Sequence, residues 1–233
     1  MPSIEEKNMK ILILDDETAI SGFVEINLKR AGHETLVAAS GEAALELIEK
    51  NHDVDIALLD VMLPGIDGFE VCRRIRQKRS NIGIIMLSAK SQESDKVTGL
   101  MIGADDYVPK PFSITELCAR VESLGRRMRV RKGEEGAEAE GFRLNEGTRQ
   151  LLRGGEEIEL TQTEFNVLKF FFDNKEKALS REDILYGVWG KNYFGDIKIV
   201  DVNIRRLRLK IEDDPANPKH IVAVRGYGYK WSD

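Results

Sequence analysis

The stretch LLDVMLPGIDGFE, residues 58–70, decides the fold of the first half of this chain. Its apolar start completes a short run, residues 56–59, which predicts a buried β-strand that ends at Asp60. A helical segment over residues 69–78 follows this strand. The neighbouring segments repeat the same unit of an apolar strand and a helix, so the stretch indicates an alternating β/α chain.

Further apolar runs predict strands over residues 11–14, 36–39, 82–87 and 106–108. Helical segments follow them around residues 20–28, 41–50, 96–101 and 114–128. This alternation is typical of an open parallel sheet with helices on both faces. We therefore predict that residues 1–128 form an α/β domain with a five-stranded parallel sheet, doubly wound like flavodoxin.

The chain changes character after this domain. Residues 129–140, RVRKGEEGAEAE, are charged and almost free of apolar side chains, which predicts a flexible linker. Residues 141–233 begin with short strands near residues 142–144, 150–152 and 158–160, and Thr161 with Glu164 fits a helix capping box. A second helix from Ser180, a third over residues 197–212 and a hairpin that turns near Gly226 complete an α+β domain.

The composition limits where the protein works. No apolar run approaches the ~20 residues that span a bilayer, and the first residues carry no apolar signal-peptide core, so we expect a cytoplasmic protein without a membrane partner. The two cysteines, Cys72 and Cys118, fit a reducing compartment. The net charge is -5, but residues 198–230 hold eight Lys and Arg against four Asp and Glu. One basic surface on an acidic protein suggests binding to DNA.

Reactive side chains follow four of the predicted parallel strands. Asp15 and Asp16 follow the first strand, Asp60 the third, Ser88 the fourth and Lys110 the fifth. Ligands of open α/β sheets bind beyond the carboxyl ends of the strands, so these side chains should meet at one edge. Three carboxylates repel one another unless a cation lies among them, and their hard oxygens suit Mg²⁺. A hydroxyl and an ammonium group beside them can hold phosphoryl oxygens, and an aspartate can act as the nucleophile.

These segments resemble response-regulator receiver domains. The resemblance covers about residues 8–128 and rests on ILILDDE, LLDVMLPGIDGFE, IIMLSAK and GADDYVPKPF, which occur in order. It implies that Asp60 accepts a phosphoryl group from a sensor histidine kinase. It also implies that Asp16 and Asp60 bind Mg²⁺ directly, that Asp15 binds it through water, and that Met62 adds its backbone carbonyl.

The same resemblance implies a conformational switch. Lys110 would pair with the phosphoryl group, Ser88 would hydrogen-bond it, Tyr107 would then turn inward, and the Lys110–Pro111 bond would be cis. In the subfamily that carries a winged helix, activation produces a symmetric dimer through charged pairs. The matching pairs in this sequence are Lys96 with Glu116, Asp106 with Arg120, and Asp105 with Arg127. We therefore expect a homodimer on activation.

The helix over residues 197–212 is predicted to have an apolar and a basic face. Ile197, Val200, Ile204, Leu207 and Ile211 form a stripe that should face the core. The opposite face carries Lys198, Val202, Arg205, Arg206 and Leu209. Such a face suits the major groove of DNA, because arginine can read guanine and valine can touch a thymine methyl group. A merely solvated face on a core helix is the alternative.

The second domain resembles the winged-helix domain of the OmpR/PhoB class of response regulators. The resemblance runs from about residue 141 to 232, through LTQTEFNVLKFF, IVDVNIRRLRLKIED and VRGYGYKW. It implies base contacts from Val202 and Arg206, backbone contacts from Arg205 and Arg208, and a minor-groove contact from Arg225. It also implies that the loop near residues 189–196 approaches RNA polymerase, although Trp189 and Tyr193 could equally be core residues.

Two other functions remain to be weighed. An aspartyl-phosphate hydrolase of the haloacid-dehalogenase kind needs a second Asp two residues after the nucleophile, and Met62 occupies that position. We therefore expect no enzyme activity beyond self-phosphorylation and autodephosphorylation. A winged-helix regulator that binds DNA without phosphorylation usually lacks one of the acids or the lysine, and this chain has all of them. The sequence leaves open whether the domains are loosely tethered or share an interface.

Overall fold

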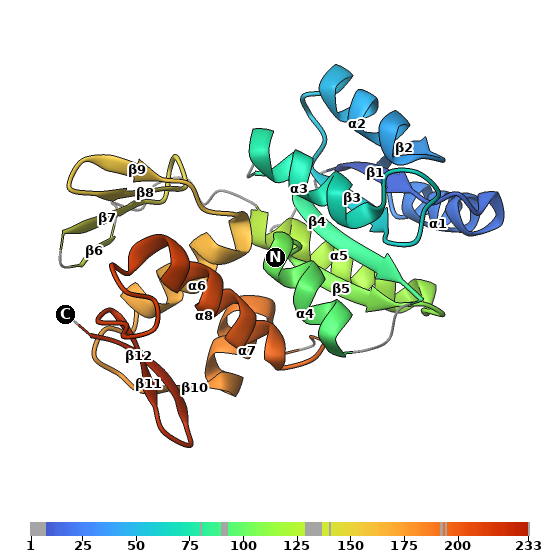
Figure 1. Cartoon of the computed structure of the whole chain (residues 1–233). Helices are drawn as coiled ribbons and strands as arrows, with labels where there is room; N and C mark the ends of the chain where they lie inside the picture. Colours follow the sequence, from blue (N-terminus) through green and yellow to red (C-terminus); the bar gives the residue numbers. More distant parts are fainter. Residues whose placement is uncertain are drawn as a thin grey trace, which may run out of the picture.

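The computed structural model describes residues 8–79, 81–89, 93–128, 137–139, 141–191, 193 and 195–232. The first domain is a parallel sheet in the order β2-β1-β3-β4-β5 (Figure 1). Its strands are β1 (Lys10–Leu14), β2 (Glu34–Ala38), β3 (Ile56–Asp60), β4 (Gly83–Ser88) and β5 (Asp106–Pro109). The prediction of a five-stranded α/β domain is therefore confirmed.

Helices cover both faces of this sheet because successive side chains of each buried strand point in opposite directions. Ile11 and Ile13 pack toward α1 (Thr18–Arg30) and α5 (Ile114–Met128). Leu12 and Leu14 pack toward α2 (Gly41–Lys50), α3 (Gly68–Lys78) and α4 (Glu93–Ile102). This two-sided core fixes the strand ends in space and thereby positions the side chains that follow them.

The second domain begins with an antiparallel sheet in the order β6-β7-β8-β9. Its strands are β6 (Ala137–Ala139), β7 (Phe142–Asn145), β8 (Gln150–Arg153) and β9 (Glu156–Ile158). The helices α6 (Gln162–Phe172), α7 (Arg181–Trp189) and α8 (Lys198–Ile211) follow. The hairpin of β11 (Ile221–Val224) and β12 (Gly228–Trp231) pairs with the short β10 (Leu179–Ser180). This is the winged-helix arrangement that the sequence predicts.

Local sequence signals explain where two helices begin, whereas two details of the second domain differ from the prediction. Thr161 with Glu164 and Ser180 with Asp183 each form a complete capping box. The third short strand lies at residues 156–158 rather than at the predicted 158–160. Strand β6 lies within the segment predicted as linker and pairs with β7. The other linker residues, 129–136 and 140, lie outside the described residues.

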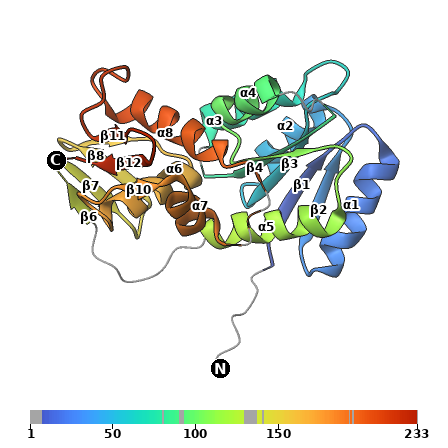
Figure 2. The same ribbon diagram turned by 90° about the horizontal axis from the view of Figure 1, so that it is seen from below.

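The two domains pack against each other. Helices α4 and α5 of the first domain contact α6, α7 and α8 of the second (Figure 2). Of the two arrangements that the sequence leaves open, the structure therefore has the domain interface. Among the described helices, none combines the length and the apolar composition needed to cross a bilayer.

Candidate functional site

The predicted reactive side chains meet at the carboxyl edge of the parallel sheet. The ammonium of Lys110 lies 2.7 Å from Oδ2 of Asp15 and 2.6 Å from Oδ2 of Asp60. Carboxylate oxygens of Asp15, Asp16 and Asp60 lie within 4.8 Å of one another. Asp15 and Asp60 are buried, whereas Asp16 is exposed. The edge therefore holds two ordered carboxylates, one accessible carboxylate and one cation.

Backbone groups orient the two buried carboxylates. The N–H of Met62 donates to Oδ1 of Asp60, and the N–H of Glu17 donates to Oδ1 of Asp15, each at 3.0 Å. A Cβ on Gly68 would lie 2.1 Å from the carbonyl oxygen of Asp60, so only glycine fits behind the aspartate. These contacts leave Oδ2 of each carboxylate directed at the ammonium.

The charge of Lys110 is secured by its neighbours. Partial burial acts to lower the pKa of Lys110, but its hydrogen bonds to Asp15 and Asp60 outweigh this effect and raise the pKa above its ordinary value. The side chain stays cationic and can balance a further negative charge at Asp60. Because one ammonium does not balance the charge of three neighbouring carboxylates, the acidic pocket could also hold a metal ion.

The predicted switch residues lie beside this site. Ser88 ends β4 with a buried side chain, and Tyr107 lies in β5, the neighbouring strand. The Tyr107 ring packs so closely on α4 that a Cβ on Gly99 would lie 3.1 Å from its Cδ2. The Lys110–Pro111 peptide bond is cis, which confirms that prediction.

Two family models match the chain. The family described as "Response regulator receiver domain" matches residues 11–122, and the family described as "Transcriptional regulatory protein, C terminal" matches residues 155–231. Response regulator DrrB of Thermotoga maritima, described as an OmpR/PhoB homolog, is 30% identical, with 97% of this chain and 100% of that chain covered and a TM-score of 0.52. The chain belongs to the OmpR/PhoB class of response regulators.

Other solved response regulators are similar in part or as a whole. The receiver domain of Francisella response regulator 1452 is 38% identical, with a TM-score of 0.51, and covers 52% of this chain and 100% of its own. A mutant of RitR is 26% identical over 97% of this chain and 100% of its own, with a TM-score of 0.79. Because that score spans both domains, RitR shares the domain arrangement of this response regulator more closely than DrrB does.

Part of the predicted DNA-facing surface of this response regulator is open to solvent. Lys198, Arg205 and Leu209 are exposed on α8, and Arg225 is exposed at the turn of the β11–β12 hairpin. Arg208 is half-buried and donates from Nε and Nη2 to the carbonyl of Ile221, at 2.9 and 2.6 Å. In this arrangement Arg208 therefore ties α8 to the hairpin.

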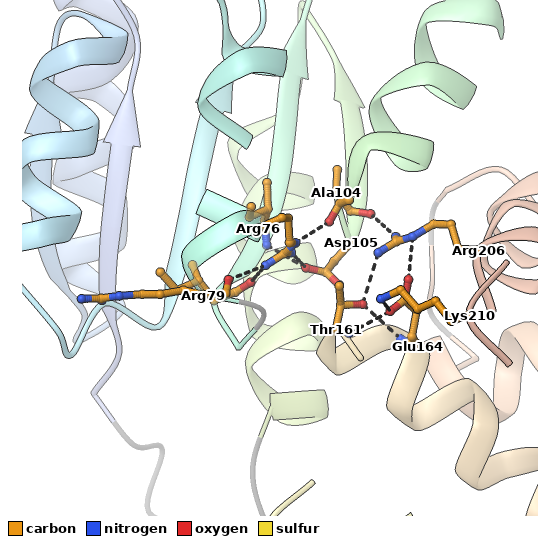
Figure 3. A network of polar contacts seen from close by, with 11 residues as sticks. Arg76, Arg79, Ala104, Asp105, Thr161, Glu164, Arg206 and Lys210 are labelled. Carbon is orange, nitrogen blue, oxygen red and sulfur yellow. Dashed lines mark hydrogen bonds and ion pairs between the residues drawn. The ribbon is translucent and has the colours of Figure 1, made fainter. Parts of the chain in front are cut away.

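The two predicted base-reading residues are covered instead. Val202 and Arg206 are each only 6% exposed, because this face of α8 packs on α4 of the receiver domain. Arg206 donates from Nη1 to the carbonyl of Ala104 at 3.1 Å, and its Nε lies 2.8 Å from Oε1 of Glu164 (Figure 3). The spacing of apolar residues along a helix predicts only which face packs in the core of its own domain. It could not predict that the receiver domain covers the opposite face.

Glu164 is the buried centre of this network. Its carboxylate pairs with Arg206 and with Lys210, whose Nζ lies 2.7 Å away (Figure 3). Burial acts to raise the pKa of Glu164, but the charges of Arg206 and Lys210 outweigh it and lower that pKa to about 2. The capping-box signal located this residue, but only the structure shows that it holds Arg206.

The predicted dimer residues face the second domain of the same chain. Arg120 donates from Nη1 to both carboxylate oxygens of Asp106 at 3.0 Å and from Nη2 to Glu116 at 2.7 Å. The hydroxyl of Tyr193 donates to Oδ1 of Asp106 at 2.9 Å, and the Arg120 guanidinium lies 5.2 Å from the centre of its ring. Tyr193, which belongs to the DNA-binding domain, therefore contacts both members of the Asp106–Arg120 pair.

The other dimer residues are engaged or covered as well. Asp105 is fully buried and pairs with Arg76 of α3 at 2.7 Å (Figure 3). Arg127 lies against the Trp189 ring at 5.7 Å. Lys96 and Glu116 line a narrow interdomain pocket of about 160 Å³. No sequence signal singled out Arg76, because an arginine on a helix is ordinarily a surface residue.

Proposed function

We propose that this transcriptional response regulator receives a phosphoryl group on Asp60 from a sensor histidine kinase. The phosphorylated form would open, dimerise and bind double-stranded DNA at specific sequences. The observation that carries the proposal is the joint placement of the Asp60–Lys110 site and a covered DNA-reading face. The unphosphorylated chain buries Val202 and Arg206 under its own receiver domain, so it needs a signal to expose them.

The geometry at Asp60 supports the chemical step. One carboxylate oxygen of Asp60 would attack the phosphorus atom, and the bond to the donor group would break, with its electron pair leaving on that group. Lys110, already 2.6 Å from Asp60, would pair with the phosphoryl oxygens. Mg²⁺, which Asp15, Asp16, Asp60 and the Met62 carbonyl would hold, would neutralise phosphoryl charge when bound. Turnover of outside substrates is not expected.

A short path supports transmission to the interface. Ser88 would hydrogen-bond the phosphoryl group, and Tyr107 in the paired strand would turn inward. Tyr107 directly follows Asp106, which holds Tyr193, and the loop before β5 contains Ala104, which holds Arg206. A shift of this strand end would therefore weaken two interdomain contacts together.

Opening would release two surfaces. The α4–β5–α5 face would become free for a second copy, with the pairs Lys96–Glu116, Asp106–Arg120 and Asp105–Arg127 formed between subunits. The α8 face would become free for the major groove, with Arg225 in the minor groove. The loop that carries Tyr193 would be released as well and could approach RNA polymerase. We place this activity in the cytoplasm, without a membrane partner.

The test measures intact mass after incubation with acetyl phosphate and Mg²⁺, beside Asp60→Asn and a sample with excess EDTA. The proposal expects a gain of one phosphoryl group in the wild type with Mg²⁺ only. Sedimentation and DNA-binding anisotropy on the same samples should then show a dimer and tighter DNA binding. An unchanged monomer with unchanged DNA affinity after full phosphorylation would overturn the switch, and equal mass gain in Asp60→Asn would overturn the assignment of the acceptor.

A further inference from the structure

A second cavity lies between the domains, separate from the pocket that Lys96 and Glu116 line. It has a volume of about 380 Å³ and lies between α5 of the receiver domain and α6 and α7 of the DNA-binding domain. Ser123, Arg126 and Arg127 line it from α5, and Arg149, Lys169 and Trp189 line it from the second domain. Both domains are therefore needed to form it.

Cations outnumber carboxylates in this lining. Four Arg and Lys side chains face two acids, Glu146 and Asp173. Both acids pair with Lys169, at 2.8 and 3.2 Å. The carboxylates of the lining are thus already engaged by one lysine, and the arginines contribute an excess of positive charge.

Arg127 is the most unusual member of the lining. Its side chain is 8% exposed, and within the described part of the chain its Nε and Nη2 have no hydrogen-bond acceptor. Its Nη1 donates only to the Ser123 hydroxyl at 3.2 Å. Burial lowers the pKa of Arg127. The charges of Asp106 and Asp105 act in the opposite direction, but these carboxylates are paired with Arg120 and Arg76 rather than with Arg127. A buried guanidinium without a bonded carboxylate is costly and rare.

The neighbouring indole adds a donor to the same lining. Nε1 of Trp189 is buried and has no acceptor among the described residues. A buried indole N–H usually finds a partner. The Arg127 guanidinium contacts the Trp189 ring and the Ser123 hydroxyl but no carboxylate, and the indole N–H beside it is unused, so an anion with several acceptor oxygens would satisfy both groups.

We propose that this cavity binds a small phosphate-bearing anion, held chiefly by Arg127. The guanidinium fork matches phosphate oxygens in pairs, which a lysine cannot do. The volume exceeds that of inorganic phosphate alone, so a phosphorylated small molecule fits the same site. Because both domains form the cavity, the bound anion favours the closed arrangement and opposes DNA binding. This last consequence rests on the function proposed above; the binding itself does not.

The test titrates unphosphorylated full-length protein with sodium phosphate, at constant ionic strength set by sodium chloride and in EDTA. Tryptophan fluorescence is the readout, since Trp189 lines the cavity and the only other tryptophan, Trp231, is in the core. Arg127→Gln removes the charge, and Arg127→Lys keeps it without the fork. Arg30→Gln, at an exposed arginine of α1, is the matched control.

The proposal expects a saturable signal in the wild type and in Arg30→Gln. In both Arg127 variants the phosphate concentration at half-saturation should be at least about tenfold higher, as expected for the loss of a charged hydrogen bond. No saturable signal in the wild type, or equal half-saturation in a folded Arg127 variant, would overturn it.

A further variant distinguishes a free anion from the chain's own acidic linker. If phosphate binds only after the linker change Glu134→Gln with Glu135→Gln, the chain's own carboxylates fill the cavity and the proposal of a free anion is wrong. None of these measurements uses Asp60, so a failure here leaves the phosphorylation switch to be judged by its own experiment.

Discussion

The hydroxyl of Tyr193 should hold the unphosphorylated response regulator closed. It donates to Asp106 at 2.9 Å across the domain interface, and Tyr193→Phe removes this oxygen while keeping the ring against Arg120. The pKa of Tyr193 is raised well above its ordinary value by burial and by Asp106, so the hydroxyl remains a donor at any physiological pH. The substitution therefore tests one hydrogen bond and little else.

The size of the effect follows from what Asp106 retains. A hydrogen bond to a charged group contributes about 1.5–3 kcal/mol, but Asp106 keeps both contacts with Arg120, so we expect a loss of about 1–2 kcal/mol. Such a loss changes a two-state equilibrium by about 5–30-fold. While the closed form dominates, apparent DNA affinity rises by the same factor, because it scales with the open fraction.

The assay is fluorescence anisotropy on a DNA duplex whose binding site has been selected in vitro with the wild-type protein. Each protein is measured with and without prior phosphorylation. Tyr193→Phe should bind more tightly than the wild type only before phosphorylation. Tyr186→Phe, at an exposed tyrosine of α7, is the control and should match the wild type in both states. Equal affinity of Tyr193→Phe and wild type before phosphorylation would refute the claim that the Tyr193 hydroxyl holds the domains closed. A gain that persists after phosphorylation would mean that Tyr193 affects DNA contact directly.

Three further predictions follow from the site and the interface. Gly68→Ala would place a Cβ 2.1 Å from the Asp60 carbonyl, so it should destabilise the receiver by about 1–3 kcal/mol and slow phosphorylation; denaturant unfolding and intact mass test this, and two unchanged results would contradict it. Because the pKa of Glu164 is lowered from 4.5 to about 2, its contribution to stability is complete above pH 4.5 and is lost as the pH falls toward 2. The gap in unfolding free energy between wild type and Glu164→Gln should therefore shrink across that window, whereas a constant gap would argue against a charged Glu164. In the phosphorylated protein, where the contact of Arg206 with Ala104 would already be broken, Arg206→Ala should lower binding to the selected site by about 1–3 kcal/mol and relax specificity, whereas Arg205→Ala should weaken binding to all duplexes alike; equal losses on random DNA would mean that Arg206 touches only phosphate.

The sequence was sufficient to locate the acidic site. Parallel strands end at one edge of a sheet, so the position of each strand in the chain already placed Asp15, Asp60 and Lys110 together. The helix starts at Thr161 and Ser180 were equally readable, since a capping box is a local signal within four residues. Local rules and a regular topology therefore predict most of the fold and the placement of these three side chains.

Contacts between the domains were not predictable in the same way. The helical period of α8 separates Val200 and Ile204 from Val202 and Arg206, and it correctly places the first pair in the core of its own domain. It carries no information on a second body packed on the opposite face. The hydrogen bond from Tyr193 likewise depends on the placement of two domains, and no spacing along the chain encodes that placement.

In the function proposed above, the closed arrangement links DNA binding to dimerisation through a single interface. Helix α8 packs on α4, Tyr193 contacts the Asp106–Arg120 pair, and Trp189 contacts Arg127. The DNA-reading face of α8 and the α4–β5–α5 face therefore become fully accessible only together. The contacts that maintain this cover include single hydrogen bonds to Ala104 and Asp106, each with a modest net contribution of about 1–3 kcal/mol. A shift from 1% to 99% open requires only about 5.5 kcal/mol of differential binding. An interface of this strength lies within reach of one phosphoryl group together with the new dimer and DNA contacts, whereas a larger apolar interface would lock the chain in its closed form.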